Sequence, residues 1–90
     1  MVTKVLKFSA YWCVPCKQLA PKFKEISENP EFKNIQFEEI DVDKNQDLAE
    51  KYKIMSVPTT IILDENDKIL SKLVGNVPEK IENKIKEYLQ

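Results

Sequence analysis

Several residue types are absent from this sequence or nearly so. It has no histidine and no arginine, and it has one glycine and two cysteines among 90 residues. No apolar run approaches the roughly 18 residues that cross a bilayer, so no membrane-spanning helix is predicted. The N-terminal segment reaches polar residues too early for a secretory signal. We therefore expect a cytoplasmic protein with no membrane partner.

The charges of the chain almost balance. Fourteen lysines are offset by fifteen acidic residues, which gives a net charge of -1. Nucleic-acid-binding proteins usually carry a clustered basic face, so no nucleic-acid partner is predicted. The length and the 42% hydrophobic content are enough for one domain over residues 1–90 and not for two. We expect this domain to be a monomer.

Hydrophobic periodicity predicts the order of strands and helices. Alternating apolar residues indicate strands, and apolar residues three or four positions apart indicate amphipathic helices. The predicted elements are, in order, a strand over 2–10, a helix from Val14 that ends at Asn29 and Pro30, a strand over 35–42, a short helix within 43–53, a hairpin of strands 59–63 and 69–74, and a helix that begins at Pro78.

This order, βαβ followed by α, ββ and α, predicts an α/β fold. A βαβ unit makes its two strands parallel, and the hairpin adds antiparallel strands. We expect a four-stranded mixed sheet with helices on both faces. Pro21 lies inside the first predicted helix, where it removes a backbone hydrogen bond. We expect it to kink the helix and divide it into two arms, or else the helix to begin later than Val14.

Cys13 and Cys16 lie where the first strand gives way to the first helix. Free backbone N–H groups at a helix N-terminus favour negative charge, which lowers the pKa of a thiol and raises its thiolate fraction. The two-residue spacer places the second thiol one turn away, close enough to form a disulfide. Pro15, inside the spacer, has no N–H to compete for the sulfurs.

Two other interpretations of the cysteine pair stay open, a zinc half-site and a pair of inert buried thiols. Zinc would need two further ligands, and without histidine or other cysteines only carboxylates remain. The acidic residues Asp41, Asp43 and Asp47 lack the glycine turn of a calcium loop, and we interpret them as helix capping. We predict no metal site, and no cofactor apart from a redox-active disulfide.

Motifs of one known pattern are spread over nearly the whole chain. They are Trp12-Cys13-Val14-Pro15-Cys16-Lys17, Pro21 in the helix that follows, Asp41 and Asp43 after the second strand, Val57-Pro58-Thr59 before the hairpin, and Val74-Gly75 before the last helix. In this combination the chain resembles the thioredoxin family. The strand and helix that full-length thioredoxins carry ahead of the cysteine strand have no match, and in this respect the chain resembles the minimal core of glutaredoxins.

The resemblance implies a thiol-disulfide oxidoreductase that reduces protein disulfides. Cys13 would be the attacking thiolate, which forms a mixed disulfide with the substrate, and Cys16 would resolve it. Thioredoxin reductase or a glutathione-type thiol would return the electrons. Strongly oxidising members often carry a histidine between the cysteines, so we expect this chain to be a reductant.

The resemblance also implies a substrate-binding surface. Trp12 would shape the surface beside Cys13, and Gly75 would lie near the substrate groove. Pro58 would be cis and face the cysteines, although only about 5 to 6% of X–Pro bonds are cis on general grounds. The backbone of Val57 would pair with an extended substrate segment.

Lys7 and Glu39 depart from the family pattern. Thioredoxins usually place a buried acid where this chain has Lys7, and a partner lysine where it has Glu39. Because a buried charge is costly unless paired, we expect the two side chains to touch. The alternative is that both reach solvent at a sheet edge. If the pair is buried, we hypothesise that Glu39 transfers protons for the resolving thiol and that Lys7 lowers the pKa of a neighbouring thiol.

Two other functions stay open. One is a glutaredoxin-like reductase of glutathione mixed disulfides, although Trp12 precedes the first cysteine and no glutathione clamp follows the hairpin. The other is a non-catalytic binding or scaffold subunit that holds a partner in the groove around Trp12, Val57 and Gly75.

Overall fold

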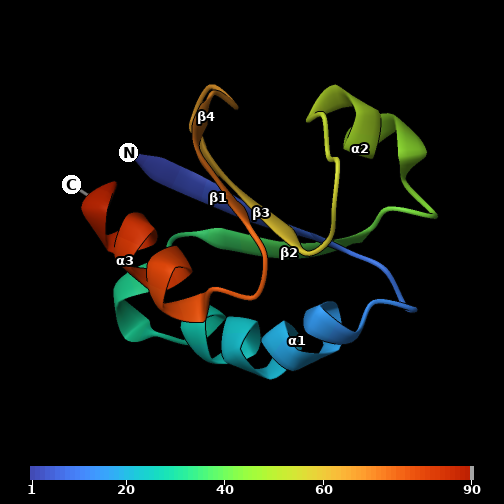
Figure 1. Cartoon of the computed structure of the whole chain (residues 1–90). Helices are drawn as coiled ribbons and strands as arrows, with labels where there is room; N and C mark the ends of the chain where they lie inside the picture. Colours follow the sequence, from blue (N-terminus) through green and yellow to red (C-terminus); the bar gives the residue numbers. More distant parts are fainter. Residues whose placement is uncertain (90) are drawn as a thin grey trace.

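A computed structural model describes residues 1–89 of the chain (Figure 1). Its elements are β1 (Val2–Ser9), α1 (Val14–Ser27), a short 3-10 helix (Pro30–Phe32), β2 (Gln36–Asp41), α2 (Gln46–Lys51), β3 (Thr59–Asp64), β4 (Ile69–Val74) and α3 (Pro78–Glu87). The predicted order of elements is confirmed, and most of their ends match the prediction or differ from it by one residue.

The four strands form one mixed sheet in the order β2-β1-β3-β4. β1 runs parallel to β2 and antiparallel to β3, and β3 and β4 form the predicted hairpin. Because β1 lies between β2 and β3, its residues 4–8 have a partner on both sides. Lys7 lies opposite Glu39 of β2 and Thr60 of β3, so these three residues share one face of the sheet.

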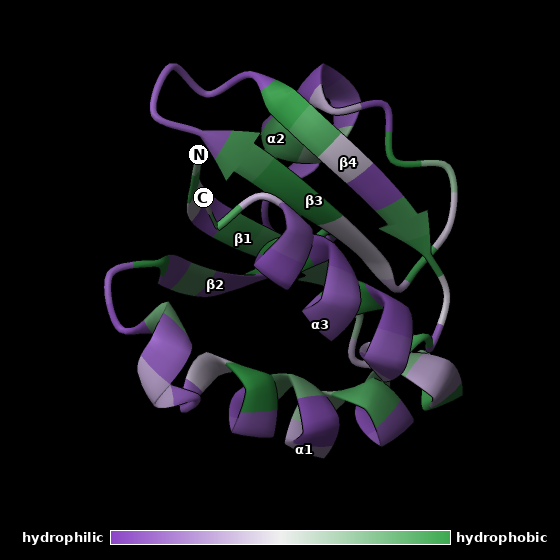
Figure 2. Cartoon of the chain, turned by 90° about the vertical axis from the view of Figure 1, so that its left-hand side faces the viewer, coloured by the Kyte–Doolittle hydropathy of each residue, from purple (hydrophilic) through white to green (hydrophobic). Residues whose placement is uncertain are grey.

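Helices cover both faces of the sheet, as predicted. α1 and α3 lie on one face and α2 lies on the other (Figure 1). The first layer packs around fully buried residues of β1, α1, β3 and α3, namely Val5, Leu19, Ile62, Ile81 and Ile85. The second layer packs under α2 and contains Leu6, Phe8, Ile40, Tyr52, Ile61 and Leu63. Figure 2 shows the same division, with the apolar residues of β1 and β3 between polar helix surfaces.

α1 begins at Val14 and continues to Ser27 as one helix, with Pro21 inside it. The expectation that Pro21 divides this helix into two arms, or delays its start, is therefore wrong. Leu19, Phe23 and Ile26 are buried against the sheet on both sides of the proline. Their packing offsets the hydrogen bond that Pro21 cannot donate.

α2 is shorter than predicted and begins at Gln46. Its N-cap residue is Asn45, whose side chain makes no capping hydrogen bond. A carboxylate oxygen of Asp41 instead accepts a hydrogen bond from the backbone N–H of Asp43, within the preceding turn. The interpretation of Asp41 and Asp43 as caps of α2 is therefore wrong.

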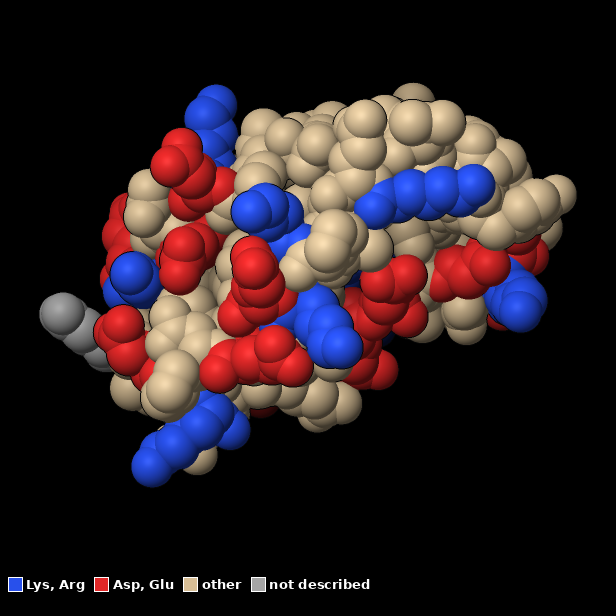
Figure 3. Space-filling model, turned by 90° about the horizontal axis from the view of Figure 1, so that it is seen from below, with Lys and Arg blue, Asp and Glu red and all other residues tan. Residues whose placement is uncertain are grey.

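Two surface properties complete the fold. No helix within residues 1–89 is long and apolar enough to cross a membrane. On the face that carries α1 and α3, lysines and acidic residues are interspersed (Figure 3).

Candidate functional site

The two cysteines form a disulfide at the N-terminus of α1, with their Cα atoms 5.3 Å apart. Cys13 is the N-cap residue, and the backbone N–H of Cys16 donates a hydrogen bond to its sulfur at 3.2 Å. The sulfur thus occupies the place that a serine or aspartate oxygen takes in an ordinary N-cap. Cys16 is the third residue of the helix, and its N–H is one of the donors that have no partner within the helix. Pro15, just before it, has no N–H of its own.

The loop before β3 faces the disulfide. Its Val57–Pro58 peptide bond is cis, and the carbonyl oxygen of Val57 lies 3.6 Å from the sulfur of Cys13. The backbone N–H of Gly75 donates a hydrogen bond to the carbonyl oxygen of Pro58 at 2.8 Å. Gly75 has a φ of 98°, a value that residues with a Cβ atom rarely adopt. The glycine thereby lets the turn after β4 come close to the Pro58 loop.

Trp12 lies beside Cys13 and is 58% exposed. Its indole N–H donates a hydrogen bond to a carboxylate oxygen of Asp43 at 3.0 Å. Trp12 and Val57 line a surface hollow of about 170 Å³ together with Ile54, Met55 and other residues of the α2 side. The predicted site residues Trp12, Cys13, Val57, Pro58 and Gly75 therefore come together at one end of the sheet.

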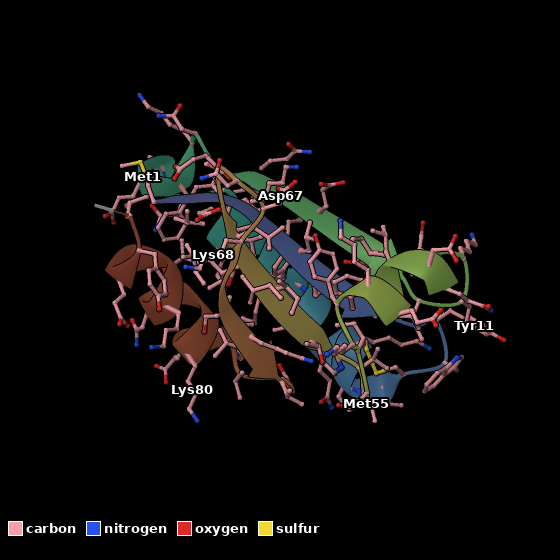
Figure 4. The ribbon with its side chains drawn as sticks, turned by 90° about the horizontal axis from the view of Figure 1, so that it is seen from above. Met1, Tyr11, Met55, Asp67, Lys68 and Lys80 are labelled. Atoms are coloured by element: carbon pink, nitrogen blue, oxygen red, sulfur yellow. A yellow bond between two sulfur atoms is a disulfide. The ribbon has the colours of Figure 1, made fainter. Side chains whose placement is uncertain are left out.

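Met55 and Asp43 belong to this surface, and the sequence reasoning missed Met55 and the contact of Asp43 with Trp12. Met55 is 91% exposed, and Figure 4 shows it at the end of the molecule that carries the disulfide, far from Met1 and Asp67. An exposed methionine three positions before a cis-proline carries no pattern that sequence reasoning could use. Asp43 was identified as a match to the family, but its partner Trp12 is 31 positions away.

Lys7 and Glu39 make the expected contact, and their surroundings differ sharply. The Nζ atom of Lys7 lies 2.9 Å from a carboxylate oxygen of Glu39. The side chain of Lys7 is 0% exposed, whereas that of Glu39 is 56% exposed. The expected ion pair is therefore present with one member in the core and the other at the surface.

No cluster that could hold a metal ion is found within residues 1–89, where three or more His, Cys, Asp or Glu side chains nowhere converge. The reactive groups that the structure shows at this site are the two sulfurs and the backbone groups around them. A pair of cysteines one helical turn apart, with one sulfur at the helix N-terminus, can alternate between dithiol and disulfide. The arrangement is that of a thiol-disulfide exchange centre.

Comparison with known proteins gives consistent matches over nearly the whole described chain. Residues 2–87 match the family model described as Thioredoxin. Thioredoxin H5 of Oryza sativa is 40% identical over 85 residues, which are 94% of this chain and 61% of that protein. The thioredoxin of Mycoplasmoides gallisepticum is 36% identical over 86 residues, which are 96% of this chain and 80% of that protein. This chain thus spans less than two thirds of the length of the rice relative.

A solved structure agrees with these sequence matches. The thioredoxin of Malassezia sympodialis superposes with a TM-score of 0.89 at 31% identity, over 97% of this chain and 75% of that one.

Proposed function

This chain belongs to the thioredoxin family, and we propose that it works as a thiol-disulfide oxidoreductase that reduces disulfide bonds in other proteins. The observation that carries the proposal is the hydrogen bond from the Cys16 N–H to the sulfur of Cys13 at 3.2 Å. In the reduced protein the same donor and the helix dipole favour the thiolate of Cys13, which is the form that attacks disulfides.

The reaction has two exchange steps. The thiolate of Cys13 attacks one sulfur of a substrate disulfide, so that a mixed disulfide forms and the other substrate sulfur leaves as a thiolate that takes up a proton. Cys16 then loses its proton and attacks the sulfur of Cys13. The Cys13–Cys16 bond forms, the second substrate sulfur leaves, and two electrons have passed from the protein to the substrate.

The substrate would lie across the exposed surface around Cys13. The carbonyl of Val57 is within 3.6 Å of the sulfur and offers a backbone acceptor to an extended segment. Trp12 and Met55 supply apolar area on one side, and the Pro58 loop is held by Gly75 on the other. These groups support a polypeptide substrate, because backbone pairing and apolar contact recognise chains of many sequences.

The electron donor is a thioredoxin reductase or a low-molecular-weight thiol of the glutathione type, and the compartment is the cytoplasm. Reduction of insulin, followed as precipitation of its free B chain, tests the proposal with each donor in turn. We expect turnover with the reductase, and loss of turnover when either cysteine is replaced by serine. If the variant with both Cys13 and Cys16 replaced by serine kept its full biological activity, the proposal would be contradicted and a scaffold indicated. Insulin reduction with glutathione as donor, and none with the reductase, would indicate a glutaredoxin-like enzyme.

A further inference from the structure

Lys7 is the one charged residue among the buried residues of the described chain. Its Nζ atom lies 5.3 Å from the centre of the Phe23 ring of α1 and 2.9 Å from the carboxylate of Glu39. Neither contact is a hydrogen bond of good geometry, and the Nζ atom has no hydrogen-bond partner within the described residues. Lys7 therefore interacts with its neighbours chiefly as a buried positive charge.

The two charges of this pair are not equally shielded from the rest of the core. Water reaches the half-exposed carboxylate of Glu39 and weakens its field, whereas the enclosed ammonium of Lys7 is screened far less. The field that reaches other buried groups on this face of the sheet is therefore positive overall.

Of the two cysteines, Cys16 is the one that lines a cleft together with Glu39. A cleft of about 310 Å³ beside β1 is lined by Ser9, Cys16, Ala20 and Glu39. Phe23, which contacts Lys7, follows Cys16 by seven residues on the same face of α1, a rise of about 10 Å. Ser9 follows Lys7 by two residues on the same face of β1, about 7 Å along the strand. Lys7 thus lies under the Phe23 turn of α1, and its partner Glu39 lines the cleft that also contains Cys16.

We propose that Lys7 is a positioning residue of the redox site, whose buried ammonium favours the thiolate of Cys16 in the reduced protein, and that Glu39 moderates this effect. The inference rests on the proposed function, because the thiolate of Cys16 matters only if Cys16 attacks the mixed disulfide at Cys13. Tyr11, Lys17 and Asp41 line the same cleft. With Glu39 they are the titratable groups that line this cleft beside Cys16, and all three are reached by solvent.

The size of the effect follows from Coulomb's law. One unscreened charge about 10 Å away, at an effective dielectric constant of about 20, changes a proton equilibrium by roughly one pH unit, or about tenfold in thiolate fraction. Removal of Lys7 and removal of Glu39 change the field in opposite directions. The two substitutions must therefore shift the titration of Cys16 in opposite directions.

The test uses Cys13→Ser protein, in which Cys16 is the only thiol, and follows its thiolate by ultraviolet absorbance as a function of pH. Lys7→Met is expected to raise the midpoint by about one unit, and Glu39→Gln to lower it. Lys7→Arg, which keeps the charge, is expected to leave the midpoint close to that of the parent. Methionine has about the length of lysine and leaves no unpaired charge in the core, so Lys7→Met is expected to fold. Glu39→Gln changes a half-exposed side chain, so this variant tests the proposal even if Lys7→Met does not fold.

Matched controls come from the same two strands. Lys4 of β1 pairs with Asp67 at 3.4 Å at the far end of the molecule, so Lys4→Met removes a charge of the same strand without reaching Cys16. Glu38→Gln removes an exposed charge beside Glu39 on the opposite face of β2. Both controls are expected to leave the midpoint within about 0.2 units.

Shifts of opposite sign for Lys7→Met and Glu39→Gln, with silent controls, would support the proposal. Shifts of the same sign, or none, would overturn it. An unmoved Cys16 midpoint in Glu39→Gln together with a slower second exchange step would also overturn it, because Glu39 would then accept the proton itself. The titration uses no substrate, so a failure of insulin reduction does not alter its outcome.

Discussion

The indole N–H of Trp12 donates a hydrogen bond to Oδ2 of Asp43 at 3.0 Å, across two segments that meet only in the folded protein. This bond holds an exposed aromatic ring beside Cys13. Asp43→Ala should let the ring move and lower kcat/KM for insulin about fivefold, mainly through KM. Steady-state kinetics check this.

Asp47→Ala serves as the control for this prediction, since it removes another exposed acid, from the first turn of α2. The double variant Trp12→Phe with Asp43→Ala should be no slower than Trp12→Phe alone, because both changes break the same bond. Additive losses would show that Asp43 acts by another route.

Gly75 is the second test, because its φ of 98° is costly for any other residue. A Cβ atom placed there would meet no atom within 4 Å, so the cost of Gly75→Ala is backbone strain without a clash. We expect a loss of about 1–3 kcal/mol in the free energy of unfolding. Urea denaturation measures it, with Asn76→Ala as the neighbouring control. An unchanged midpoint would mean that the turn relaxes freely.

Lys72 of β4 holds the segment that leads to the active-site loop. Its Nζ atom donates to the carbonyl oxygens of Lys53 at 2.8 Å and Tyr52 at 3.4 Å, at the end of α2. Lys72→Met should cost about 1 kcal/mol and speed amide hydrogen exchange over residues 53–57. Lys68→Met, at the hairpin turn, should do neither. Unchanged exchange in Lys72→Met would rule out this link.

Asp64 gives the pH dependence of the hairpin. The backbone N–H of Lys68, helped by that of Asn66, holds the pKa of its carboxyl below the ordinary value of 3.8. Above pH 3.8 the ionised carboxylate of Asp64 therefore stabilises the folded state. As the pH falls from 3.8 through the lower pKa of the folded state, this stabilisation is lost.

The difference in urea midpoint between the parent and Asp64→Asn should accordingly be largest at neutral pH and disappear near about pH 2. Glu65→Gln, which changes the adjacent exposed carboxyl, should show no such trend. A difference that stays constant with pH would argue against an ionisation effect.

Much of this fold could be predicted because its elements keep simple periods. The strands 59–63 and 69–74 and the helix that opens at Pro78 differ from the observed elements by a residue or two at most of their ends. α1 was harder to predict, since the cost of Pro21 is local while the packing of Leu19 and Phe23 that outweighs it is tertiary.

The site was predicted where its residues are close in sequence and less well where they are distant. The spacing of Cys13 and Cys16 is visible in the chain, but the bond between Trp12 and Asp43 depends on how two loops meet. That Lys7 would touch Glu39 was expected. The unequal exposure of the two side chains was not, because it depends on Lys7 lying on the central strand and Glu39 on an edge strand.

The order of attack by the two cysteines can be tested most directly by mass spectrometry of a trapped intermediate. Reduced Cys16→Ser protein, mixed with a peptide dimer joined by one disulfide, should form a stable adduct with one peptide through Cys13. Cys13→Ser protein should form little or none at the same pH. A predominant adduct through Cys16, or equal adducts in both variants, would contradict the account.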